Sequence, residues 1–127
     1  MLSARPLSTL LGAAAAIAVV TSVAACYTDA PTYASCSEDI GCAEGADGCF
    51  RVLLTRTDGT TGDAAFCTRG CSRHDECPGG GLCLQLVGDA TSRLLCYQAC
   101  TTSGDCYSPL VCTSTTGASG DPTVCMP

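Results

Sequence analysis

The spacing of the cysteines is the feature that most constrains this chain. Thirteen cysteines occur in 127 residues, and twelve of them fall into three groups of four. The second and third groups share the spacing C-x5-C-x5-C-x12-C and repeat every 29 residues, whereas the first has one extra residue before its third cysteine and five more before its fourth. Such a period indicates a small structural unit repeated in tandem. The groups are Cys36, Cys42, Cys49 and Cys67; Cys71, Cys77, Cys83 and Cys96; and Cys100, Cys106, Cys112 and Cys125.

The cysteines also have to replace a conventional core. From Tyr27 onward, 16 of 101 residues are Val, Ile, Leu, Met or Phe, which is too few for the core of an ordinary domain of this length. Two disulfides per unit would compensate, each contributing about 3 kcal/mol. Four cysteines allow three pairings. We favour first-to-third with second-to-fourth, because this pattern clips the first turn of each unit to the base of its hairpin.

The long spacer between the third and fourth cysteines of each group predicts a β-hairpin. Apolar and polar residues alternate in it, and turn-forming residues such as Asp58-Gly59 interrupt it, which is the usual hairpin signal. The first spacer of each group opens with Ser or Thr, which can cap a single helical turn. We therefore expect a small disulfide-rich fold of three tandem β-hairpin modules with little regular secondary structure. The expected strands and turns are 50–55, 58–59 and 64–67; 82–86, 88–89 and 93–97; and 110–115, 117–121 and 123–126.

The first 25 residues have the layout of a helical signal peptide. Arg5 is followed by a largely apolar run over residues 7–20, which is too short to span a bilayer, and then by small residues. The sequence VAAC ending at Cys26 resembles a bacterial lipobox, which implies that Cys26 carries a lipid anchor after cleavage. Removing Cys26 from thirteen cysteines leaves an even twelve for disulfides. The alternative is ordinary secretion after cleavage at residues 22–24, with Cys26 as a spare thiol.

These features divide the chain into five segments. A mature protein starting at Cys26 keeps twelve acidic residues and five of the six arginines, a formal charge of −7. Residues 27–35 are polar and predict an extended tether of about 30 Å. Tyr27 in place of Asp favours the outer membrane or cell surface by the enteric sorting rule. The segments are 1–25, signal peptide; 26–35, lipidated cysteine and tether; 36–67, first module; 68–96, second module; and 97–127, third module.

Two resemblances accompany this pattern. The run CSRHDECPGGGLC, followed by C-x3-C-x5-C, resembles the N-terminal cysteine-rich region of Dickkopf proteins in its cysteine spacing from Cys71 to Cys112. More broadly, the chain is similar to cysteine-rich repeat lipoproteins of large, GC-rich bacterial genomes, which fits its use of arginine without lysine. This similarity implies a location at the cell surface. Modules like epidermal growth factor are an alternative with the same favoured pairing, but their C-x-C is absent.

Signatures of catalysis or of zinc binding are absent from the sequence. There is no C-x2-C pair, and the single histidine, His74, aligns with Asp39 and Ser103 in the other modules. We interpret His74 as an exposed turn residue, because a role common to all modules would keep the residue type. With twelve cysteines paired, no thiol is left in the modules for nucleophilic chemistry. The net charge of −6 disfavours nucleic acid as a partner.

Two interpretations of the acidic residues are open. Carboxylates could form weak calcium sites, whereas the absence of a D-x-D-x-D-G loop favours a solvated acidic surface. The residues concerned are Asp39, Asp47, Asp58, Asp63, Asp75, Glu76, Asp89, Asp105 and Asp121.

Hairpin tips on a rigid frame are suitable places for binding, because function tends to lie on loops. We expect an exported, noncatalytic binding or structural protein of the cell envelope, with no cofactor, no metal and no nucleic acid. Its contacts would be the membrane, through the lipid anchor, and an extracellular or envelope protein or glycan. The alternative is a secreted protease inhibitor or toxin-like effector, in which Arg56 of the longest tip, residues 56–63, would contact a trypsin-like protease.

Overall fold

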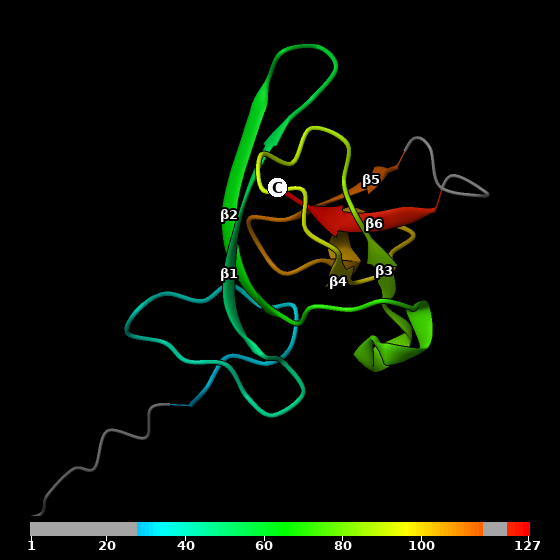
Figure 1. Cartoon of the computed structure of the whole chain (residues 1–127). Coiled ribbons are helices and arrows are strands. Elements are labelled where there is room, and N and C mark those ends of the chain that lie inside the picture. The colour runs from blue at the N-terminus through cyan, green and yellow to red at the C-terminus, as the bar shows by residue number, and fades with distance from the viewer. Residues whose placement is uncertain (1–27, 116–121) are drawn as a thin grey trace, which may run out of the picture.

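Three β-hairpins make up most of the folded chain. The computed structural model describes residues 28–115 and 122–127. In these residues the strands form three separate two-stranded antiparallel sheets (Figure 1). The predicted fold class, a small disulfide-rich protein of hairpins, is confirmed. The elements are β1 (Gly48–Thr55), β2 (Thr61–Thr68), the 3-10 turns η1 (His74–Glu76) and η2 (Pro78–Gly80), β3 (Leu82–Leu84), β4 (Leu95–Tyr97), the 3-10 turn η3 (Ser103–Asp105), β5 (Val111–Ser114) and β6 (Thr123–Met126).

The hairpins differ from the predicted ones mainly in length. In the first module the ladder runs the full length from Gly48, opposite Thr68, to Thr55, opposite Thr61. In the second module pairing stops at Leu84, and residues 85–94 leave the ladder as a long loop. The predicted turn at 117–121 and the predicted signal helix lie outside the described residues.

Two disulfides hold each hairpin to the segment that precedes it. In all three modules the first cysteine bonds to the third and the second to the fourth, so the favoured pairing is confirmed. The third and fourth cysteines lie opposite each other in the ladder, yet each bonds to a cysteine of the preceding turn. The disulfides are Cys36–Cys49, Cys42–Cys67, Cys71–Cys83, Cys77–Cys96, Cys100–Cys112 and Cys106–Cys125.

In each module, the residues just before the first cysteine form a short edge segment that pairs antiparallel with the second strand of the hairpin. In the first module, Cys67 donates its N–H to the carbonyl of Ala34 at 2.9 Å, and Cys36 donates to that of Ala65 at 3.2 Å. The repeated unit is therefore a hairpin with an additional edge segment. The equivalent hydrogen bonds run from Cys96 to Arg69 and from Cys71 to Leu94 in the second module, and from Cys125 to Gln98 and from Cys100 to Thr123 in the third.

Residues 30–35 consequently belong to the folded part of the protein. Ala30, Tyr33 and Ala34 are buried, and the Tyr33 hydroxyl donates to the carbonyl of Pro78 in the second module at 2.7 Å. The extended tether predicted over residues 27–35 is thus wrong for this stretch. Its apolar side chains show no period because they pack mainly against disulfides rather than against a sheet face.

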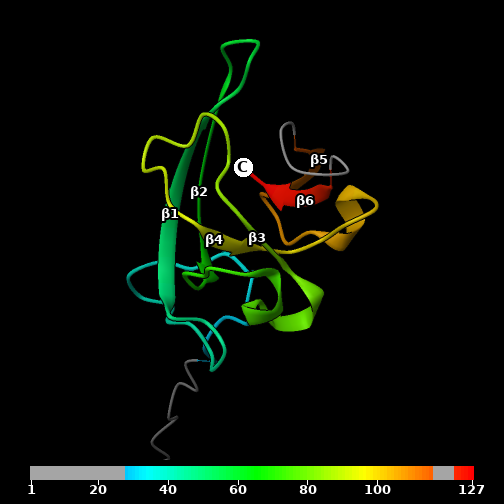
Figure 2. The ribbon, with the colours of Figure 1, turned by 45° about the vertical axis from the view of Figure 1, so that its right-hand side comes forward.

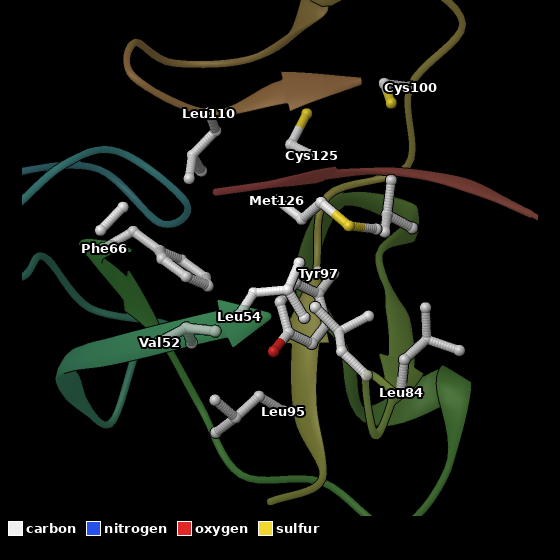
Figure 3. Packing of buried hydrophobic residues seen from close by; sticks show 13 residues of the cluster. Val52, Leu54, Phe66, Leu84, Leu95, Tyr97, Cys100, Leu110, Cys125 and Met126 are labelled. Carbon is white, nitrogen blue, oxygen red and sulfur yellow. The ribbon is translucent and has the colours of Figure 1, made fainter. Parts of the chain in front are cut away.

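One hydrophobic cluster joins the three hairpins. The rings of Phe66 from the first module and Tyr97 from the second lie 5.8 Å apart between centroids (Figure 3). The prediction that the apolar residues are too few for a core needs correction, because they are concentrated where the hairpins face one another. The buried residues of this shared cluster are Val52, Leu54, Ala64, Phe66, Leu84, Leu86, Leu95, Tyr97, Cys100, Leu110, Val124, Cys125 and Met126.

The loop of the second module covers the free edge of β1 (Figure 2). Thr55 donates its N–H to the carbonyl of Gly88 at 3.0 Å, and Ala90 donates to that of Leu53 at 3.2 Å. Gly88 has a φ of 90°, and a Cβ at this position would lie 2.1 Å from the carbonyl oxygen of Thr55. Only glycine allows this approach, so the sequence of the second tip fixes how the second module docks on the first.

We expect Gly88→Ala to lower the free energy of unfolding by about 1–3 kcal/mol, since it adds both backbone strain and a steric clash. Denaturant unfolding of the oxidised protein measures the change. Gly79→Ala is the matched control, because Gly79 also has a positive φ of 61° but a Cβ there meets nothing within 4 Å. Equal losses in the two variants would contradict the docking contact.

Candidate functional site: a cleft between the three hairpins

An open cleft of about 440 Å³ lies where the three hairpins meet. Apolar side chains form most of its wall, and hydroxyl groups, the amide of Gln85 and one arginine form the rest. This volume is within the range of about 300–1,000 Å³ that small-molecule sites occupy. The lining residues are Leu54, Thr55, Arg56, Thr57, Cys83, Leu84, Gln85, Leu86, Val87, Thr113, Ser114, Thr115 and Met126.

Alternation along the second module builds one wall of the cleft. Leu84 and Leu86 are buried, whereas Gln85 is exposed and Val87 is 72% exposed at the rim. Leu54 at the end of β1 and Met126 at the end of β6 belong to the same shared cluster (Figure 3). The floor of the cleft is therefore continuous with the core. Sequence reasoning missed this site, because alternation indicates burial but not that three distant tips converge.

Arg56 stands at the rim of the cleft and is held by the first tip. Its N–H donates to the carbonyl of Thr60 at 2.8 Å, and Gly59, with a φ of 84°, donates back to the carbonyl of Arg56 at 2.9 Å. The guanidinium donates through Nη2 to a backbone oxygen of Pro127, with a longer contact of 3.4 Å from Nη1 to Thr60 Oγ1. Pro127 is buried, so Arg56 joins the first tip to the third module.

This geometry counts against Arg56 as a protease contact. A loop that mimics a protease substrate needs an extended backbone and a side chain free to enter the enzyme's pocket. The first tip is instead a tight turn, and the Arg56 side chain is folded onto Pro127.

In each of the first two modules, an aspartate side chain holds the turn at the hairpin tip. The carboxylate of Asp58 accepts hydrogen bonds from the N–H of Thr60 at 2.9 Å and from its hydroxyl at 2.6 Å. These bonds hold the pKa of Asp58 below its usual value. Asp89 accepts from the N–H and the hydroxyl of Thr91 at 3.0 and 2.8 Å. The sequence D-x-T thus marks a side-chain-capped turn in both tips.

The other described acidic residues are spread over the surface. Asp63 pairs with Arg51 across β1 and β2, with 2.8 Å between Arg51 Nε and Asp63 Oδ1, and this pairing lowers the pKa of Asp63. Glu76 accepts the N–H of Ser72 at 2.9 Å. Within residues 28–115 and 122–127, no three carboxylates lie close enough to share one ion. Asp121 lies outside those residues.

Asp105 caps the first turn of the third module. It accepts hydrogen bonds from the N–H groups of Thr101 and Thr102 at 2.9 and 3.0 Å, and from the Thr101 hydroxyl at 3.0 Å. The two backbone N–H groups, followed by the hydroxyl, lower the pKa of Asp105. The carboxylate of Asp105, directly before the second cysteine, therefore caps this turn. The sequence predicts that the leading residue, Thr101, is the cap, but Thr101 instead donates its N–H to Asp105.

Asp105→Asn should lower stability at neutral pH and reduce its loss in acid. A carboxylate with a lowered pKa in the folded state stabilises the fold above its unfolded pKa of about 3.9, and this contribution disappears as the pH falls through the folded pKa. Denaturant unfolding from pH 7 to 2 measures both effects. The exposed Asp39 has no hydrogen bond or ion pair in the described structure, so Asp39→Asn is the control. Identical acid profiles for wild type and Asp105→Asn would refute the cap.

His74 has a structural role that the sequence did not reveal. It is exposed, as predicted, and its Nδ1 accepts the N–H of Cys83 at 2.9 Å. At the same position of the third module, Ser103 Oγ accepts the N–H of Cys112 at 3.2 Å. Two residue types fill one role, so the inference that a common role would preserve the residue type is wrong.

Three groups of cysteines bring sulfur atoms within metal-ligand distance of one another. In each group three sulfurs lie within 4.8 Å, and all of these cysteines are in disulfides. The thiolate, not the disulfide, is the metal ligand. These groups are therefore pairs of disulfides packed against each other at the base of each hairpin.

The predicted lipidation site, Cys26, and the predicted signal peptide lie outside the described residues. Within the described part of the chain, no helix is long and apolar enough to cross a membrane. Comparison with protein-family models, with curated proteins and with solved structures found no match.

Proposed function

We propose that this protein is an exported, noncatalytic binding protein of the cell envelope that is anchored by lipid at Cys26. Six disulfides in one small fold are typical of an oxidising environment outside the cytosol. The apolar run, the small residues and the VAAC sequence before the modules support export with a lipid anchor. More than one acyl chain gives a stable attachment to the membrane.

The observation that carries the binding role is the cleft. Three modules contribute to its wall, and the cleft opens to solvent at the point where the hairpins converge, above apolar residues that belong to the buried shared cluster. Concave sites with an apolar wall and a few polar groups are the usual places for ligands. The partner would be a small molecule, or a part of an extracellular or envelope protein or glycan.

The position of the anchor supports the same conclusion. Ala30 donates its N–H to the carbonyl of Gly41 at 2.8 Å and accepts from Ala43 at 2.9 Å, so the folded part begins four residues after Cys26. Four extended residues span at most about 14 Å, which holds the folded part close to the membrane. The segment after residue 28 lies at the end of the molecule opposite the first tip (Figures 1 and 2). The tips would thus face away from the membrane.

Cys26→Ala tests the anchor. We expect the wild-type protein, expressed in its native cells, to incorporate an alkyne-labelled fatty acid, and Cys26→Ala to lose this label completely while keeping six disulfides. The double variant Cys36→Ala/Cys49→Ala is the control, because it removes a cysteine pair but should keep the label. Labelling of Cys26→Ala would refute lipidation at this cysteine.

A further inference from the structure

One of the twelve module cysteines, Cys49, is exposed to solvent. It is the second residue of β1, whose alternation buries Val52 and Leu54 on one face and turns Cys49 to the other. The other eleven cysteines are buried or half-buried, and each belongs to or packs against one of the three hydrophobic clusters, whereas Cys49 is in none of them. Cys49 is therefore the module cysteine that a dissolved reagent reaches most easily.

The third cysteines of the other two modules are covered. Cys83 is buried in one cluster with Tyr33, which comes from the segment before the first module. Cys112 is half-buried and packs against the shared cluster. Cys49 occupies the same position of its module but lies outside every cluster of the described residues. Its exposure is thus particular to the first module and not a property of the repeat.

Both cysteines of the Cys36–Cys49 disulfide line an open pocket of about 430 Å³. This pocket shares no lining residue with the cleft, and the start of β1 lies at the end of the first hairpin away from its tip (Figure 1). A thiolate has to approach a disulfide sulfur directly to react with it, so access decides which disulfides exchange. The other lining residues are Ser37, Glu38, Arg51 and Ala65.

The first module keeps other restraints when this disulfide opens. The Cys42–Cys67 disulfide remains, and Cys67 is fully buried. Cys36 still donates its N–H to the carbonyl of Ala65 at 3.2 Å, and its sulfur lies within 4.8 Å of both sulfurs of Cys42–Cys67. Opening the bond at Cys49 is therefore a local change, after which Cys36 can return to Cys49 or attack the neighbouring disulfide.

We propose that Cys49 is a thiol-exchange site, at which a small-molecule thiol becomes attached to the protein as a mixed disulfide. The incoming thiolate attacks Cys49 Sγ and forms a new S–S bond, and the electron pair of the broken Cys36–Cys49 bond leaves on Cys36 Sγ. The proton that the incoming thiol gives up passes through water to Cys36. One S–S bond forms and one breaks, so no oxidant or reductant is consumed.

In this step Cys49 is the electrophile, so the reaction needs no free thiol in the modules. Without an added thiol the protein keeps its six disulfides. The inference depends neither on the cleft nor on the lipid anchor.

Peptide mapping of the oxidised Cys26→Ala protein, which has no thirteenth cysteine, tests this assignment. 2-Mercaptoethanol is added to the native protein, free thiols are blocked with N-ethylmaleimide at intervals, and the adducts are located by mass spectrometry without reduction. We expect the thiol on Cys49 at least about tenfold sooner than on any other cysteine, because exchange rates depend on access. The maleimide is expected on Cys36. A maleimide on Cys42 or Cys67 beside the Cys49 adduct supports the site equally, since it reports attack by the released Cys36 on its neighbour.

Gly88→Ala separates attack on the folded protein from attack after unfolding. Gly88 contacts Thr55 at the far end of β1 from Cys49, and its substitution is expected to destabilise the fold. Adducts at the buried Cys77–Cys96 disulfide should then form at least about fivefold faster, because the unfolded population rises. The rate at Cys49 should change less than about twofold, because the folded protein already exposes it. Equal acceleration at both disulfides would overturn the assignment.

Ala65→Leu tests entry through the pocket. Ala65 is half-buried and lines the pocket from β2, so a larger side chain there narrows the approach and should slow the adduct at Cys49 several-fold. Thr61→Leu is the matched control, because Thr61 is exposed at the other end of β2 and outside the pocket. Equal rates at Cys49 in the two variants would contradict the pocket route.

Three further results would overturn the assignment: no adduct on the native protein, an adduct on Cys36 with the maleimide on Cys49, or adducts on Cys83 and Cys112 as fast as on Cys49. The Cys36→Ala/Cys49→Ala variant lacks this disulfide and should acquire no fast adduct, so an adduct formed at the wild-type rate would place the exchange elsewhere. All of these outcomes leave the proposed binding role of the cleft unchanged, and loss of that role would leave exchange at Cys49 unchanged.

Discussion

Replacing Cys77 and Cys96 together by alanine is expected to lower the free energy of unfolding by about 3 kcal/mol or more. The two cysteines are 19 residues apart, and their bond restricts the unfolded chain. Both are buried, and with Cys83 and Tyr33 they form the second cluster of the fold. The substitution therefore also leaves a poorly filled space, which adds to the loss. Guanidinium unfolding of the two oxidised proteins measures the difference.

Removing Cys71–Cys83 provides the matched comparison. Its separation of 12 residues makes the loss from chain entropy only about 0.4 kcal/mol smaller. Cys71 is less buried than Cys77. If the two losses in unfolding free energy differ by more than this chain-entropy term, the excess reports the packing around Cys77–Cys96. Losses below 1 kcal/mol in both variants would contradict the view that disulfides compensate for the small apolar content.

Phe66→Ala is expected to lower the free energy of unfolding by about 3–5 kcal/mol, the usual range for truncating a buried aromatic residue. Phe66 is 1% exposed and lies on β2 against Tyr97 of β4. Because the cluster is shared, the loss should spread over all three modules. Hydrogen exchange measures this spread through the amides of Cys67, Cys96 and Cys125, each of which donates to the edge segment of its own module.

Two controls bracket the effect of Phe66→Ala. Tyr97→Phe keeps the ring, and the Tyr97 hydroxyl has no protein hydrogen-bond partner among the described residues, so its effect should be small. Leu53→Ala removes a side chain that is 45% exposed and should also cost little. If Phe66→Ala accelerates exchange at Cys67 but leaves Cys125 unchanged, the modules fold independently and the shared core is refuted.

Local features of the fold could be predicted from the sequence. Cysteine spacing predicts three units of four cysteines but leaves three pairings open in each unit, and the favoured pairing comes from the expected contact between the first turn and the hairpin base, which the disulfides confirm. The alternation of apolar and polar residues predicts the strands, because the two strands of each hairpin are close to each other in the chain. Asp58-Gly59 predicts its turn because Gly59 supplies the positive φ.

Contacts between modules could not be predicted in this way. Tyr33 is assigned to a tether by its polar neighbours, and only its contact with Pro78, 45 residues away, explains its burial. The sequence predicts only an ordinary turn at Gly88. The close approach of the Thr55 backbone is what requires glycine at this position. The cleft is missed for the same reason, because Leu54, Leu84 and Met126 come from different modules.

The mass of the intact protein, purified from native membranes without reduction, is the most direct test of an exported, lipid-anchored disulfide protein. We expect a chain that begins at Cys26, carries three acyl chains and lacks the two hydrogen atoms that each of the six disulfides removes. Treatment with an alkylating reagent should leave this mass unchanged. An unacylated mass, or alkylation of any module cysteine, would contradict this description of the protein.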